Sequence, residues 1–151
     1  MTVVDERTVA PSVSVTAQLS PGTRLVPARI GTWAHNQVMP IPCPSWCVED
    51  HLEFPSAFED ISHYGEPQTV AVPSFLGGTD VHYVWWARLE SDPAASDERM
   101  RAAHLIVGDD STFEARVSDE MADKLADDLI VFAMQLRQQA RAARQANRAA
   151  A

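Results

Sequence analysis

Hydrophobic and polar residues alternate most regularly over residues 80–90. Val81, Tyr83 and Trp85 begin an apolar row that falls on one face of an extended chain. The same period predicts strands over residues 101–107 and 112–117, joined across residues 108–111 as a hairpin. A fourth strand is expected from residues 69–74 or 23–34, and Pro27 restricts the second of these to an edge.

From Ser118 onward the hydrophobic period changes to that of an amphipathic helix. Ser118 is a good N-cap, and Asp119 and Glu120 follow it where the helix dipole favours acids. An apolar stripe then recurs in steps of three and four residues, at Met121, Leu125, Leu129, Phe132 and Leu136. The predicted fold class is therefore α+β, with a small antiparallel sheet of three to five strands packed by one long C-terminal helix.

The composition divides the chain into three parts. Residues 1–22 are expected to form a mobile N-terminal arm, and residues 23–136 a single α+β domain with a zinc knuckle at 40–66. Residues 137–151 are rich in arginine and alanine and are interpreted as a helix end or a frayed tail.

The entry to the knuckle is stiffened by Pro40, Pro42 and Pro44, since each fixes φ and biases its predecessor to an extended conformation. Proline is also favoured at the first position of a helix. We therefore predict one or two turns of helix from Pro44 to about His51, with Cys43 as the cap.

Both cysteines of the chain lie close to two of its histidines, and this cluster is the main candidate for chemistry. Cys43, Cys47, His51 and His63 form the donor set of a closed tetrahedral zinc site. We predict a structural zinc ion here, with Glu49 and Asp50 as acceptors that orient an imidazole. The alternatives to a zinc site are an iron–sulfur cluster, or a pair of buried cysteines beside ordinary surface histidines.

The sequence from Cys43 to His51 reads Cys-Pro-x-Trp-Cys-x-x-Asp-His, and a later histidine, strands and a Ser-Asp-Glu helix start follow it. In these features the chain resembles a family of small actinobacterial proteins. That family is known only as a domain of unknown function. The resemblance implies that Cys43, Cys47, His51 and His63 are motif positions, and it implies no substrate or activity.

Charge is distributed unevenly along the chain. The net charge is −9, yet residues 137–151 contain no acid and carry arginines at helical spacing: Arg137, Arg141, Arg144 and Arg148. The acidic body repels nucleic acids and anionic membranes, so the arginine face is the candidate surface for a protein partner, self-association or DNA. No secretory signal or membrane-length apolar run is seen, and a cytoplasmic location is expected.

Recognisable signatures of nucleotide binding and hydrolysis, such as GxGxxG, HExxH and GxSxG, do not occur. Their absence favours a role other than catalysis. The leading hypothesis is a zinc-stabilised binding or regulatory module that acts through a macromolecular partner. A metal-dependent hydrolase is the first alternative, with an open Cys2His zinc site and Glu49 or Asp50 as the base. The second is a DNA-binding accessory protein that uses the C-terminal arginine face.

Overall fold

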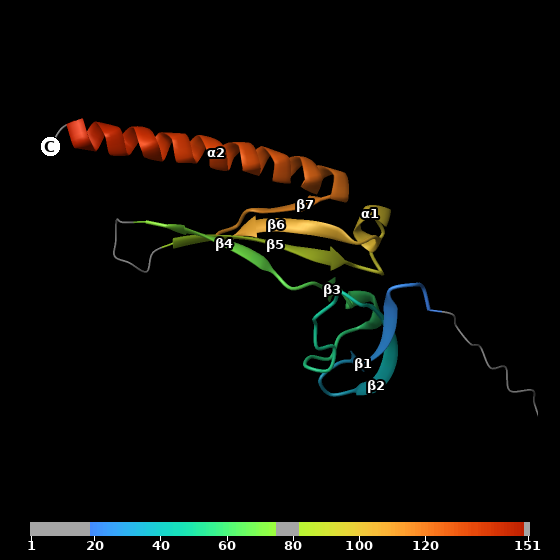
Figure 1. The fold of residues 1–151 in the computed structure, drawn as a ribbon. Coiled ribbons are helices and arrows are strands. Elements are labelled where there is room, and N and C mark those ends of the chain that lie inside the picture. Colours follow the sequence, from blue (N-terminus) through green and yellow to red (C-terminus); the bar gives the residue numbers. More distant parts are fainter. Residues whose placement is uncertain (1–18, 75–81, 150–151) are drawn as a thin grey trace, which may run out of the picture.

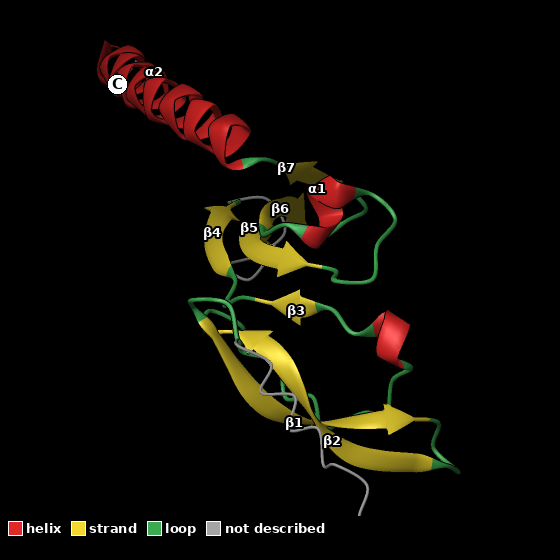
Figure 2. Ribbon diagram, turned by 90° about the vertical axis from the view of Figure 1, so that its right-hand side faces the viewer, coloured by secondary structure: helices red, strands yellow, loops and turns green. Residues whose placement is uncertain are grey.

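The computed structural model describes residues 19–74 and 82–149 and divides them between two antiparallel sheets and one long helix. A two-stranded sheet lies on one side of a five-stranded sheet, and the helix α2 lies on the other side (Figures 1 and 2). The predicted α+β class, with a small sheet and a long C-terminal helix, is confirmed.

The two-stranded sheet is a hairpin of β1 (Thr23–Gly31) and β2 (Asn36–Pro44). Pro27 lies opposite Pro40 in the register of the hairpin. At this position neither residue has to donate a hydrogen bond to the other strand, so two residues without an N–H donor are tolerated. In the connecting turn the Thr32 N–H donates to His35 O at 2.8 Å. The strand predicted over 23–34 is present here rather than in the larger sheet, and β2 was not predicted as a strand.

The core beside this hairpin is small. It consists of Ala28, Ile41 and Ile61, with Val26 and Ile30 packed against it. The outer edge of β1 is covered by the loop 51–56, since Arg29 N donates to His51 O at 2.9 Å and Gly31 N donates to Ser56 O at 3.0 Å. A short 3-10 helix, η1 (Phe58–Asp60), then leads toward the second sheet.

The five-stranded sheet contains β3 (His63–Tyr64), β4 (Gln68–Pro73), β5 (His82–Ser91), β6 (His104–Asp109) and β7 (Glu114–Val117). β5 is central: it pairs with β6 on one edge and with both β3 and β4 on the other, and β7 follows β6. The strands predicted over 112–117 and 69–74 are confirmed with shifted ends, and the strand predicted over 80–90 is confirmed from His82 onward, while residues 80 and 81 lie outside the described residues. The strand predicted over 101–107 begins later, at His104, because α1 (Glu98–Arg101), which is capped by Asp97, ends only at Arg101.

The helix α2 (Asp119–Ala149) is 31 residues long and begins where the sequence predicted. Ser118 Oγ accepts a hydrogen bond from Met121 N at 3.2 Å, which caps its first turn. α2 contacts β6 and β7 near its start, and none of its described residues is buried. Among the described residues, no helix is both long and apolar enough to cross a membrane.

Candidate metal centre

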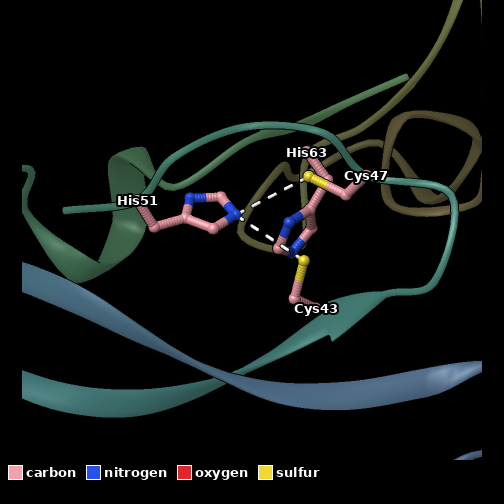
Figure 3. A group of neighbouring side chains, drawn as sticks. All are labelled: Cys43, Cys47, His51 and His63. Carbon is pink, nitrogen blue, oxygen red and sulfur yellow. Dashed lines mark hydrogen bonds between the residues drawn. The ribbon is translucent and has the colours of Figure 1, made fainter. Parts of the chain in front are cut away.

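Four predicted ligands converge from both sheets. Cys43 lies near the end of β2, Cys47 and His51 lie in the loop that follows, and His63 is the first residue of β3 in the larger sheet. Figure 3 shows the two sulfur atoms and the two imidazole rings directed toward one another. An ion held here would therefore connect the hairpin to the five-stranded sheet.

The donor atoms are arranged at metal-binding distances. One ligand atom from each of the four residues lies within 4.8 Å of the other three. His51 Nε2 is 3.7 Å from Sγ of both Cys43 and Cys47, and the His51 and His63 rings are 5.2 Å apart and nearly perpendicular. With metal–sulfur and metal–nitrogen bonds of about 2.3 and 2.0 Å, tetrahedral donors stand about 3.5 Å apart, close to the spacing of this cluster.

The cysteines are brought together by a turn and not by the helix predicted from Pro44 to His51, so that prediction is wrong. Pro44 belongs to β2 and its carbonyl accepts a hydrogen bond from Cys47 N at 3.1 Å. The chain then runs on without regular structure, and Val48 N donates to Tyr64 O at 2.9 Å. The proline segment pairs with β1, and this tertiary pairing overrides the local preference of proline for a helix start.

The cluster is largely buried. Cys43, Cys47 and His63 are each at most 2% exposed, and His51 is half-buried. Burial raises the pKa of the Cys43 thiol to about 11, an effect to which the neighbouring Cys47 adds. Burial also lowers the pKa of His63 to about 4, with a contribution from nearby His51, whose own pKa is lowered by burial.

The pKa shifts of the two histidines are compatible with the binding of a cation. The lowered pKa values keep both imidazoles neutral, which is the form that binds metal. His63 Nδ1 is buried and has no hydrogen-bond partner among the described residues, an arrangement that native proteins normally avoid. A divalent cation would replace the thiol protons, and two thiolates would then neutralise its charge. The four residues are thus suited to hold a metal ion.

Glu49 and Asp50 lie beside the cluster but are exposed. Asp50 Oδ1 accepts a hydrogen bond from Leu52 N at 2.9 Å, and in the described part of the chain neither carboxylate is hydrogen-bonded to His51 or His63. Both line a cavity of about 210 Å³ that also touches His51. Their predicted role as acceptors that orient an imidazole stays a prediction.

The C-terminal arginines are not part of this site. Arg137, Arg141, Arg144 and Arg148 are all exposed on α2, which lies across the five-stranded sheet from the metal centre (Figure 1).

A buried polar cluster on the larger sheet was missed from the sequence. Glu90 and His104 lie opposite each other on β5 and β6, each at most 6% exposed, and His104 Nε2 is 3.5 Å from Glu90 Oε2. Arg116 Nε lies 3.7 Å from the same oxygen. Once the β5–β6 register is known, the three residues fall on one face of the sheet, but the register could not be read from the alternation alone.

A family model described as a domain of unknown function, DUF6907, matches residues 27–145. The match includes all four residues of the cluster and most of α2. No curated protein and no solved structure matches the chain.

Proposed function

We propose that this chain, which belongs to the DUF6907 family, is a zinc-stabilised binding module that acts through a macromolecular partner. One observation carries the proposal: two thiols and two imidazoles, three of them buried, have ligand atoms within 4.8 Å of one another. Zinc is favoured by this donor set, because mixed sulfur and nitrogen ligands in a tetrahedral arrangement are typical of structural zinc sites.

The completeness of the donor set supports a structural rather than a catalytic ion. A catalytic zinc keeps a position open for water or substrate, whereas four protein ligands close the coordination sphere. His63 decides between the two, since without it a Cys2His site would remain open. The position of His63 inside the cluster, buried and paired through the β3 backbone with Ser91, supports the closed site.

A large apolar surface supports the binding part of the proposal. The face of the sheet toward α2 and the first half of α2 enclose an open groove of about 730 Å³. Trp85, Phe113 and Leu129 on its walls are 48%, 59% and 41% exposed. Soluble monomers rarely leave large apolar patches uncovered, and such patches are typical of interaction surfaces.

The test is metal analysis of the purified protein and of two ligand variants. One zinc per chain is expected in protein purified without chelator, with equal loss in Cys47→Ser and His63→Ala. His35→Ala is the matched control, because His35 is exposed and outside the cluster. If His63→Ala retains zinc and fold while Glu49→Gln or Asp50→Asn abolishes hydrolytic turnover, the open-site hydrolase is correct instead.

A further inference from the structure

The helix α2 carries a regular seam of exposed residues whose spacing is three and four in strict alternation. This seam consists of Glu120, Asp123, Asp127, Ile130, Met134, Arg137, Arg141 and Arg144. Alternating steps of three and four keep side chains along one line of a helix, and this is the period by which helices pair in coiled coils.

The seam is available for contact. All eight residues are exposed, including Ile130 at 61% and Met134 at 59%. No ion pair among the described residues engages its acids or its arginines; the one ion pair on α2, between Lys124 and Asp128, lies off the seam. Ile130 and Met134 are therefore open to contact between the acids and the arginines of the seam.

The order of charges along the seam is self-complementary about Phe132. Twelve residues on either side of it are Glu120 and Arg144, and nine residues on either side are Asp123 and Arg141. The same relation joins Asp127 to Arg137 at five residues, and Ile130 to Met134 at two. Every acid of the seam therefore has an arginine as its mirror position, and the apolar pair occupies the centre.

We infer that α2 pairs in antiparallel orientation with α2 of a second copy of this chain. In a two-fold symmetric interface, residue i of one copy meets residue j of the other, and j meets i. Antiparallel pairing centred on Phe132 places an acid against an arginine in each charged layer and Ile130 against Met134 in the middle. A parallel pair would place like charges together.

The seam itself selects a second copy over other partners. A nucleic acid would attract the arginines but would be repelled by Glu120, Asp123 and Asp127 on the same line. An unrelated protein would require no mirror symmetry within the helix. The inference names one partner for the module and so rests on the proposed binding function, but it uses none of the metal-site residues.

The dimer should be weak and sensitive to salt. From Glu120 to Arg144 the seam is about 36 Å long at 1.5 Å per residue, and charged layers outnumber apolar ones. Exposed ion pairs are screened once the Debye length falls toward 3 Å. We expect the dissociation constant to rise roughly tenfold or more between 50 mM and 1 M salt.

The experiment is sedimentation equilibrium of the full chain and of charge-reversed variants. The first variant, Asp123→Arg with Asp127→Arg, makes the seam nearly all basic, and the second, Arg137→Glu with Arg141→Glu, makes it nearly all acidic. Each variant alone should be monomeric, their equimolar mixture should form a heterodimer, and all four substitutions in one chain should restore the homodimer. The chain with no substitutions should be dimeric at low salt and about 100 µM, because this protein concentration is well above a dissociation constant of about 1 µM for the dimer.

The matched control is Glu59→Arg with Glu66→Arg, which changes net charge by the same amount at exposed positions off the seam and should stay dimeric. Circular dichroism and zinc content of every variant verify folding. A monomeric natural chain, or dimers that survive either reversal, would overturn the inference. If protein purified without chelator dimerises but contains no zinc, the proposed zinc site is overturned and the helix pairing stands.

Discussion

Removal of one thiolate is the most direct test of the metal centre. In Cys47→Ser the hydroxyl replaces a ligand that is 2% exposed, and three donors remain. A structural zinc ion contributes about 10–16 kcal/mol at neutral pH. The core around it has two buried isoleucines, Ile41 and Ile61, which contribute about 1.5–3 kcal/mol each. The ion is therefore the larger stabilising contribution, and residues 40–66 should unfold without it.

Elemental analysis combined with amide hydrogen exchange measures this outcome. We expect zinc in Cys47→Ser to fall below about a tenth of an equivalent, and amides of residues 40–66 to lose protection. Amides of β6 should stay protected, because this strand pairs on both edges and supplies none of the four cluster residues. Full zinc content, or unchanged protection at Cys47 and His63, would refute the reasoning.

Three further predictions concern the ligands and the hairpin. His63→Ala should lose as much zinc as Cys47→Ser by elemental analysis; retention of the ion would mean that three ligands suffice. Zinc uptake at pH 7.5 should release about two protons per ion, seen by calorimetry in buffers of different ionisation enthalpy, because free cysteine thiols with a pKa of about 8.5 are mostly protonated at this pH and bind zinc as thiolates. Gly31→Ala should lower stability by about 1–3 kcal/mol in denaturant titration, since Gly31 has φ of 130° and a Cβ there meets His35 O, whereas Gly22→Ala, with open space around it, should cost less.

The sequence was sufficient for elements with a regular period. The alternation over 80–90 and the stripe from Met121 predicted β5 and α2, because a sheet face and a helix face each require a repeating apolar pattern. It was insufficient where tertiary pairing decides. Pro40, Pro42 and Pro44 contradict the usual composition of strands, yet β2 forms because it pairs with β1 in a two-stranded sheet that tolerates missing donors.

The four cluster residues were found from the sequence for a different reason. Cysteine and histidine are rare in this chain, so their concentration within 43–63 was visible without knowledge of the backbone. The route by which they meet was not visible. A helix would have placed Cys43, Cys47 and His51 along one face, whereas a strand end, a turn and a loop bring them together. Donor chemistry was predictable, and the geometry that positions it depended on long-range pairing.

The position of His63 gives the metal centre a role beyond the knuckle. Its backbone pairs with Ser91 at one end of β5, and β3 contributes only two residues to the sheet. So short a strand makes few ladder bonds, and one of its side chains belongs to the metal cluster. Loss of the ion should release β3 first, and any loss of protection in β5 should then decline from Ser91 toward Trp85, where β4 and β6 both still pair. The seam on α2 lies outside the region where amide protection is expected to fall. A second copy should therefore be bound equally well with and without zinc.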